Sequence, residues 1–211
     1  MNIKLILIIV FSILYGLFEI FMSRRKQDNR KISKSGDKGS IWLLTISISI
    51  GYWFSFMIAS TNIGRIYHWN TFFVIGSFLV LTGLIIRVTS IMKLRQQFTY
   101  TVTSLENHEL IETGLYKVIR HPGYLGQLII FLGTSVCLSN WLSIILMIIP
   151  VLSGYLNRIK VEERFMIEQM GQKYLDYRKR TKRLIPWTRN YIPEQTGDPV
   201  NIINDFTRKI S

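Results

Sequence analysis

Three long stretches of the sequence carry no charged side chain, and they restrict the fold more than any other feature. Residues 41–64, 66–86 and 122–157 contain no Asp, Glu, Lys or Arg. A helix needs about 20 apolar residues to cross the hydrocarbon core of a bilayer, and a helix satisfies its own backbone hydrogen bonds there. These stretches therefore predict transmembrane helices in an all-α integral membrane protein.

The third stretch is too long for one crossing, because a helix of its length would extend about 54 Å at 1.5 Å per residue. Ser139 and Asn140 lie near its middle and favour a turn, so we expect a tight hairpin of two short spans. A further span is expected over residues 5–22, which are apolar apart from Glu19. The alternative there is a signal peptide, but no small-residue cleavage site follows before Arg24. The total is five spans.

The basic residues are segregated along the chain. The formal net charge is +13, and 23 of the 26 Lys and Arg residues fall in three segments, 23–40, 93–121 and 158–211. Lys and Arg concentrate in cytoplasmic loops, so this pattern predicts an N-terminus outside and a C-terminus in the cytoplasm. The basic side should also contact the anionic lipids of the cytoplasmic leaflet.

The composition also excludes several classes of protein. With 48% hydrophobic residues, the chain is too apolar for a disordered protein and does not suit a soluble nucleic-acid binder. Its three histidines are too scattered for a zinc site, so we expect neither a nucleic acid nor a metal as partner. The single cysteine, Cys137, lies inside an expected span and suits a packing role.

Two polar segments flank the expected hairpin and hold the candidate site. In the first, a turn at Thr113 and Gly114 precedes a short helix over residues 115–120. His121 and Tyr124 then lie at the start of the fourth span. In the second, Arg158 and Glu162 are four residues apart and share one face of a helix. Both ends of a short hairpin emerge on the same side, so these four side chains should be neighbours.

Such a cluster suits a cationic or zwitterionic cofactor. Aromatic faces attract sulfonium or ammonium groups, carboxylates accept hydrogen bonds, and histidine exchanges protons near pH 7. Other interpretations remain open for these residues. Arg120 and Tyr124 also suit interfacial anchoring, and Arg158 with Glu162 also suits a solvated ion pair. Residues 165–177 carry a partly apolar face typical of a helix lying in the interface.

Over residues 94–186 the sequence resembles the isoprenylcysteine carboxyl methyltransferase family and the related membrane phospholipid methyltransferases. The motifs stand in two groups on either side of the hairpin. The first group is His108-Glu109-Leu110-Ile111, then Gly114-Leu115-Tyr116, then Arg120-His121-Pro122-Gly123-Tyr124-Leu125-Gly126. The second group is Arg158, Glu162, Glu163, Gly171, Tyr174, Tyr177, Arg183 and Pro186. The five-span layout is similar to that of compact prokaryotic members.

The resemblance implies S-adenosylmethionine-dependent methyl transfer at the cytoplasmic face of a prokaryotic membrane. It implies that His108, Glu109, Leu110 and Ile111 hold the cofactor mainly through backbone groups, and that Tyr116, His121, Pro122, Gly123 and Tyr124 line the same pocket. It assigns catalysis to Arg158 and Glu162. Glu162 would accept a hydrogen bond from the cofactor, and Arg158 would bind the acceptor's carboxylate. Gly123 departs from the family, which often has a larger residue there.

The implied acceptor is lipophilic and resembles an isoprenylcysteine; a phospholipid amine and a small thiol are the alternatives. A noncatalytic carrier is disfavoured because carriers hold polar residues at midplane depth. A nicotinamide-dependent membrane reductase is disfavoured because no GxGxxG motif follows a strand. We expect three parts: transmembrane helices over 1–93, a methyltransferase core over 94–187 and a flexible tail over 188–211.

Overall fold

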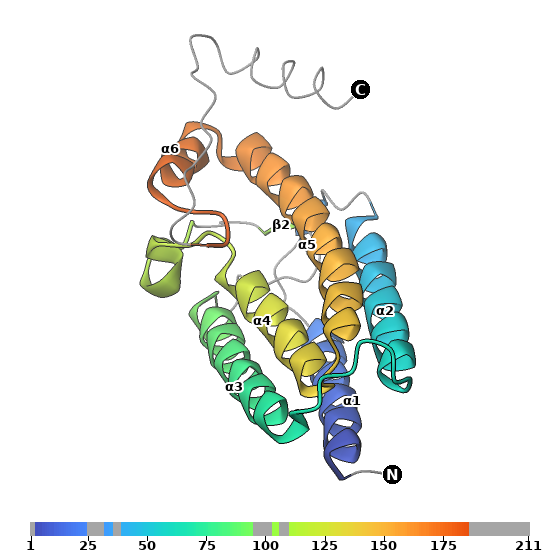
Figure 1. The fold of residues 1–211 in the computed structure, drawn as a ribbon. Coiled ribbons are helices and arrows are strands. Elements are labelled where there is room, and N and C mark those ends of the chain that lie inside the picture. Colours follow the sequence, from blue (N-terminus) through green and yellow to red (C-terminus); the bar gives the residue numbers. More distant parts are fainter. Residues whose placement is uncertain (1–2, 25–31, 36–38, 95–102, 106–109, 186–211) are drawn as a thin grey trace.

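The computed structural model describes residues 3–24, 32–35, 39–94, 103–105 and 110–185. Its long elements are helices (Figure 1). In chain order they are α1 (Ile3–Arg24), α2 (Ser40–Ala59), α3 (Trp69–Leu94), the 3-10 helix η2 (Gly114–Lys117), α4 (Pro122–Cys137), α5 (Trp141–Met170) and α6 (Gln172–Arg180). The expected all-α membrane fold is confirmed. The three-part division stays a prediction, and the tail lies outside the described residues.

Four helices of the described part, α1, α2, α3 and α5, are long and apolar enough to cross a membrane. The fourth expected span is α4, which has only 16 residues. At 1.5 Å per residue it extends about 24 Å, less than the ~30 Å hydrocarbon core of a typical bilayer. The number of five spans therefore stays a prediction.

Helices α2 and α3 end at other residues than the charge-free stretches that predicted them. Helix α2 stops at Ala59, where the hydroxyls of Ser60 and Thr61 turn back to the carbonyls of Met57 and Ile58. Helix α3 continues past Arg87 to Leu94. Arg87 stays in the helix because its guanidinium forms two hydrogen bonds with the Glu19 carboxylate, at 2.9 and 3.1 Å. A buried charge is tolerated in a bundle when it is paired.

The hairpin turn is confirmed at Ser139 and Asn140, between the end of α4 and the start of α5. Ser139 takes a positive φ of 52°. The Asn140 side-chain oxygen caps α5 by accepting from the backbone N–H of Ser143 at 3.1 Å. Its amide nitrogen donates to the carbonyl of Ile63 at 2.7 Å. The turn thereby fixes α4 and α5 side by side and attaches them to the loop between α2 and α3 (Figure 1).

Helices α3 and α4 pack through glycines that allow their backbones to approach closely. A Cβ atom at Gly83 of α3 would lie 2.6 Å from the carbonyl oxygen of Gly126 in α4. A Cβ atom at Gly133 would lie 2.7 Å from the carbonyl oxygen of Gly76. Small residues of this kind drive helix association in membranes, where no hydrophobic effect draws helices together. The contact holds the start of α4, and with it the candidate site, against α3.

We expect Gly83→Leu to separate α3 from α4, because its side chain would meet backbone atoms that cannot rotate away. Overpacking costs about 1–3 kcal/mol or more, so the thermal unfolding midpoint in detergent should fall by several degrees. The matched control is Gly16→Leu in α1, where an added Cβ meets nothing within 4 Å. Equal midpoints for the two variants, measured by tryptophan fluorescence, would contradict this packing.

The structure adds a small sheet that the sequence did not predict. Strand β1 (Ile32–Ser35) pairs antiparallel with β2 (Thr103–Leu105), and Ile32 lies opposite Leu105. The pairing joins the loop after α1 to the segment that leads toward residues 108–111. It could not be predicted because both strands are very short and far apart in the sequence.

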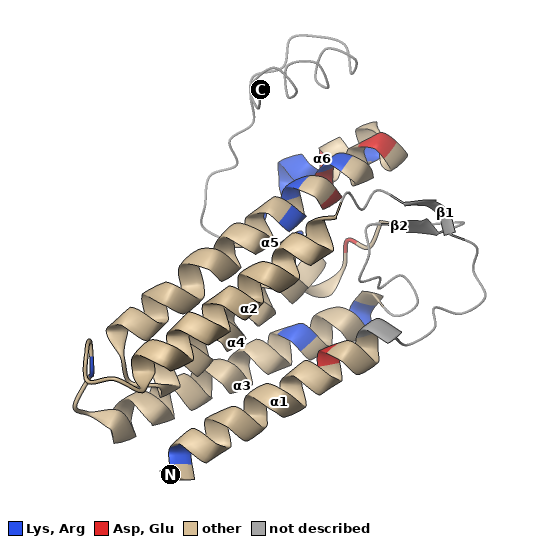
Figure 2. Ribbon diagram, turned by 90° about the vertical axis from the view of Figure 1, so that its right-hand side faces the viewer, with Lys and Arg blue, Asp and Glu red and all other residues tan. Residues whose placement is uncertain are grey.

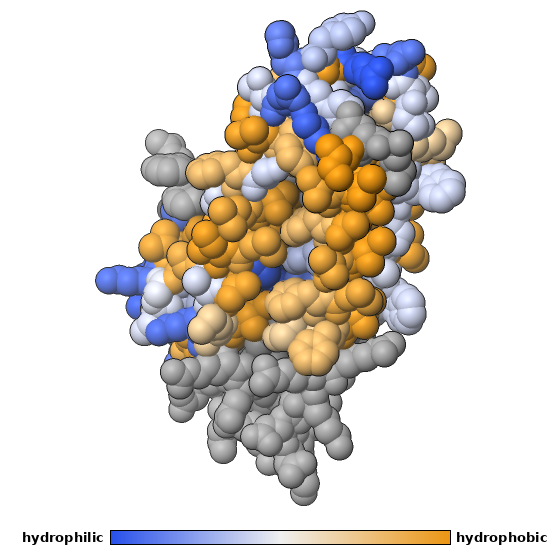
Figure 3. All heavy atoms as spheres, turned by 90° about the horizontal axis from the view of Figure 1, so that it is seen from below, coloured by the Kyte–Doolittle hydropathy of each residue, from blue (hydrophilic) through white to orange (hydrophobic). Residues whose placement is uncertain are grey.

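Charged side chains and exposed apolar side chains lie mainly in different parts of the bundle. Most charged side chains of the described helices gather around α6 and the adjoining end of α5, while the long helices are otherwise almost uncharged apart from a few residues on α1 and α3 (Figure 2). Large apolar side chains, including those of Leu14, Trp53 and Phe78, are exposed on α1, α2 and α3. Apolar residues also dominate the face seen in Figure 3. This distribution suits a lipid-embedded bundle with one polar end.

Candidate functional site

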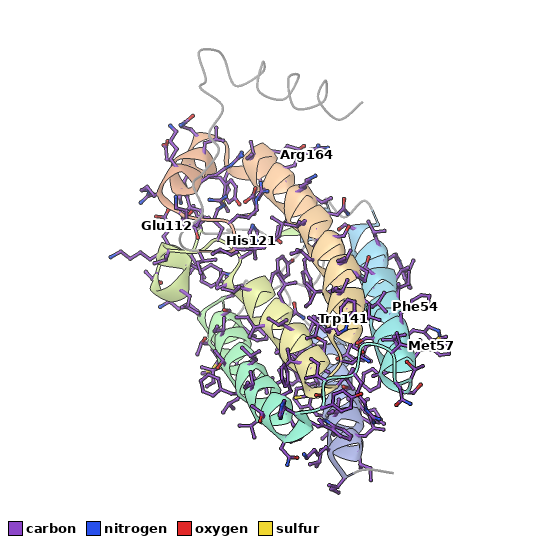
Figure 4. All side chains as sticks on the ribbon, viewed as in Figure 1. Phe54, Met57, Glu112, His121, Trp141 and Arg164 are labelled. Atoms are coloured by element: carbon purple, nitrogen blue, oxygen red, sulfur yellow. The ribbon has the colours of Figure 1, made fainter. Side chains whose placement is uncertain are left out.

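The expected cluster forms at the polar end of the bundle, between the start of α4 and the far half of α5. His121 (labelled in Figure 4) stacks on Tyr124, with ring centroids 5.6 Å apart and planes 6° apart. The Nδ1 atom of His121 lies 3.7 Å from Oε2 of Glu162. The Tyr124 hydroxyl lies within hydrogen-bonding reach of both Arg158 and Glu162. The predicted proximity of these four side chains is confirmed, and their roles stay predictions.

Tyr116 adds a second aromatic wall to this cluster. Its side chain is buried, and the charges of Glu162 and Arg87 both act on its hydroxyl. Burial raises the pKa of this hydroxyl above its ordinary value, and the Glu162 charge raises it further. Tyr116 therefore stays neutral and able to donate a hydrogen bond at physiological pH. Its position is fixed because Tyr177 of α6 donates to its backbone carbonyl at 2.7 Å.

Two atoms of the cluster are buried without a hydrogen bond of good geometry. They are Oε2 of Glu162 and Nε2 of His121. The His121 atom lies 3.4 Å from Oε1 of Glu163, which also accepts from Nε of Arg120 at 2.8 Å. A buried polar atom left unsatisfied costs about 1–3 kcal/mol. Oε2 of Glu162 is therefore a natural position for a polar group of a ligand, and a cofactor rich in donors fits it.

Arg158 is almost fully buried, at 2% exposure, near the point where the charge-free part of α5 ends. Its Nη1 atom donates to Oγ of Ser40, the first residue of α2, at 2.5 Å. The alternative interpretation of a solvated ion pair is therefore wrong for Arg158. It lies inside the protein because α2 packs along α5 and covers this face.

Arg120 and Glu163 belong to a buried ion-pair network that we call the Glu163 cage. Nε of Arg120 donates to Oε1 of Glu163 at 2.8 Å, and Nη2 of Arg183 donates to Oε2 at 2.7 Å. Arg120 also donates to the carbonyls of Arg178 and Thr181. The backbone N–H groups of Arg120 and His121 also donate to the carbonyls of Lys182 and Arg183, respectively. These contacts hold the segment after α6 against the start of α4 and against the candidate site.

The cage buries the Arg120 guanidinium and pairs it with Glu163, which supports a structural role for Arg120. It also explains the partly apolar face of residues 165–177. Phe165, Tyr174 and Tyr177 are buried inside the protein, so these side chains pack against the rest of the protein, and the expectation of a helix lying in the lipid interface stays a prediction. Gly171, with φ 53°, ends α5, and α6 begins directly after it.

The remaining predicted site residues are His108, Glu109, Leu110, Ile111, Pro122 and Gly123. His108 and Glu109 lie outside the described residues. Leu110 and Ile111 are half-buried just before η2, and Pro122 is the first residue of α4, where its missing N–H costs nothing. A Cβ atom at Gly123 would lie 3.0 Å from Nη1 of Arg87. The Arg87 guanidinium therefore fills part of the space that a larger residue would need at this position.

Sequence reasoning missed Ser40 and the pairing of Arg87 with Glu19. Neither has a local signal, because each contact joins residues more than 60 positions apart. Cys137 is buried with Ile8 and Leu138, in agreement with a packing role. In the part of the chain that the structure describes, no group of three or more His, Cys, Asp or Glu side chains could hold a metal ion.

Known proteins resemble this chain in sequence and in structure. The family model described as phospholipid methyltransferase matches residues 71–173. Protein-S-isoprenylcysteine O-methyltransferase B of Arabidopsis thaliana is 32% identical over 114 residues, which are 53% of this chain and 58% of that protein. The Saccharomyces cerevisiae protein-S-isoprenylcysteine O-methyltransferase is 32% identical over 116 residues, 54% of this chain and 48% of that protein.

Among solved structures, the eukaryotic intramembrane Ras methyltransferase, isoprenylcysteine carboxyl methyltransferase, has a TM-score of 0.55 and 26% sequence identity. The likeness covers 68% of this chain and 52% of that chain. The chain is thus similar, in sequence over about half of its length and in fold, to membrane proteins of the isoprenylcysteine carboxyl methyltransferase family. The chain spans 58% of the length of the Arabidopsis relative and 48% of the length of the Saccharomyces relative.

Proposed function

We propose that this protein is an integral-membrane methyltransferase that transfers the methyl group of S-adenosylmethionine to the carboxylate of an isoprenylcysteine-like lipophilic acceptor. The observation that carries the proposal is the cluster of Tyr124, Arg158, Glu162 and His121, which is packed at the polar end of the bundle. The resemblance to isoprenylcysteine O-methyltransferases supports the same reaction. The gathering of charge at this end supports a cytoplasmic location for the site and the C-terminus.

The residues present fit S-adenosylmethionine. This cofactor supplies a methyl group on a positively charged sulfur, and the Tyr124 and Tyr116 rings offer aromatic faces to such a cation. Glu162 has a buried oxygen available to accept from a hydroxyl or amino group. The backbone of residues 108–111 and the start of α4 with Pro122 and Gly123 complete the proposed binding site, as the family resemblance implies.

Arg158 favours a carboxylate over the other acceptors. It is a buried cation with a fixed position. An amine that gains positive charge on methylation would be repelled by it, whereas a carboxylate would be attracted. The apolar surface of the helices can accommodate the lipophilic part of the acceptor. A phospholipid amine and a small thiol are therefore the less favoured acceptors.

The proposed chemistry is a displacement at the methyl carbon. A carboxylate oxygen of the acceptor forms the new C–O bond as the C–S bond breaks, and the positive charge on sulfur is lost. No covalent intermediate on the protein is needed, so the chain contributes alignment of the reactants and exclusion of water. Arg158 would orient the carboxylate, while Glu162, Tyr116 and Tyr124 would orient the cofactor.

We expect Glu162→Gln to weaken binding of S-adenosylmethionine by about tenfold, because a carboxylate that accepts from donors of the ligand is worth ~1.5–3 kcal/mol. The measurement is isothermal titration of the purified protein in detergent. Glu168→Gln, an exposed position on the same helix, is the matched control. Absence of cofactor binding by the folded wild-type protein would refute the proposed cofactor. Unchanged affinity in Glu162→Gln would refute only the role of Glu162.

A further inference from the structure

The first residue of α2 uses its hydroxyl in an unusual way. A serine at the start of a helix ordinarily caps it by accepting from the helix's own N–H groups. Here the cap position belongs to Gly39, with φ 78°, and no side chain caps the helix. Ser40 is buried, at 3% exposure, and its Oγ accepts instead from Nη1 of Arg158.

The helix pair that brings Ser40 to Arg158 is closely packed. A Cβ atom at Gly154 of α5 would lie 2.9 Å from Cβ of Ser47 in α2, so the two helices are in close contact. At the far end of the pair, the Ser55 hydroxyl donates to the carbonyl of Ser143 at 3.0 Å, and the Ser143 hydroxyl donates back at 2.8 Å. The position of Oγ of Ser40 relative to α5 is therefore set by packing along the whole pair.

An arginine side chain has several rotatable bonds and needs such support to act at one position. The Arg158 guanidinium is held by Ser40 on one side and lies within reach of the Tyr124 hydroxyl on another. The start of α2 also carries the partial positive charge of a helix N-terminus, which adds to that of Arg158. Both features favour an anionic group of the acceptor at this point.

We infer that Ser40 is a positioning residue for methyl transfer: its hydroxyl holds the Arg158 guanidinium where it binds the acceptor's carboxylate. The inference rests on the proposed function and extends it to α2, which lies outside the motifs of the family resemblance and outside residues 71–173. It assigns α2 a part in acceptor recognition in addition to its part in the membrane bundle.

The test is steady-state kinetics of the full chain with a farnesylcysteine analogue as acceptor. We expect Ser40→Ala to raise the KM for the acceptor by about tenfold, from loss of a hydrogen bond to a charged group, with unchanged affinity for S-adenosylmethionine. Ser40→Cys, which keeps the volume but accepts weakly, should behave like Ser40→Ala. Ser40→Thr retains the hydroxyl and should restore the KM to within about twofold.

Ser49→Ala is the matched control, because this exposed hydroxyl donates to the carbonyl of Thr45 in its own helix. Wild-type KM in both Ser40→Ala and Ser40→Cys would overturn the inference. Equal losses of acceptor and cofactor binding together with a lower unfolding midpoint would also overturn it, since they indicate a structural role. A wild-type protein that binds no cofactor and methylates no acceptor would refute the proposed function itself.

Discussion

Replacing Arg158 by alanine is expected to reduce kcat/KM for a carboxylate acceptor by at least about 100-fold. Removing one partner of a desolvated charged pair typically costs ~2–5 kcal/mol, and Arg158 is the buried cation of the proposed acceptor site. Affinity for S-adenosylmethionine should change by less than about threefold, because the proposed cofactor contacts come from Glu162 and the aromatic rings. The measurement combines steady-state kinetics with cofactor titration.

Two further variants make this prediction specific. Arg158→Lys keeps the charge but loses the planar fork that holds Ser40 and a carboxylate together, so it should recover only part of the activity. Arg164→Ala removes an exposed arginine six residues along the same helix (labelled in Figure 4) and should leave activity unchanged. If Arg158→Ala loses no more activity than Arg164→Ala, Arg158 does not bind the acceptor.

Glu163→Gln is expected to destabilise the protein more than any other single substitution proposed above. Removing one partner of a buried ion pair costs ~3–5 kcal/mol, because the other charges stay buried and uncompensated. Here Arg120 and Arg183 both donate to the lost carboxylate. At about 2–4 °C per kcal/mol for a chain of this size, the unfolding midpoint should fall by about 10 °C.

The comparison of neighbouring glutamates separates structure from binding. Glu162→Gln should keep a near-wild-type midpoint and lose cofactor affinity, since Glu162 has a buried oxygen without a good hydrogen bond. Glu163→Gln should lose stability first, with cofactor binding falling only as α6 and the segment after it detach from the site. Tryptophan fluorescence during heating in detergent measures the midpoint. A Glu163→Gln midpoint equal to that of Glu168→Gln would contradict the Glu163 cage.

The membrane fold and the centre of the site followed from local patterns in the sequence. Charge-free length predicted the long helices, and Ser139 with Asn140 predicted the hairpin. The hairpin in turn predicted that His121 and Tyr124 would meet Arg158 and Glu162. These predictions succeeded because a short connection leaves the chain little choice about which ends lie together.

The remaining features depend on contacts between distant segments. Arg120 could not be assigned from the sequence, because its partners come from α5 and from the segment after α6. Glu19 and Arg87 were visible as charges in apolar stretches, but nothing local indicated that they pair. Ser40 carried no local signal of a functional role. Its contact with Arg158 exists only because α2 packs on α5.

The most direct test of the proposed function is methyl transfer by the purified full chain in liposomes containing labelled S-adenosylmethionine. Three acceptors are supplied separately: a farnesylcysteine analogue with a free carboxylate, phosphatidylethanolamine and a small thiol. We expect label on the farnesylcysteine analogue as a base-labile methyl ester, and little on the other two. Label on the phospholipid or the thiol but not on the carboxylate would contradict the proposed reaction.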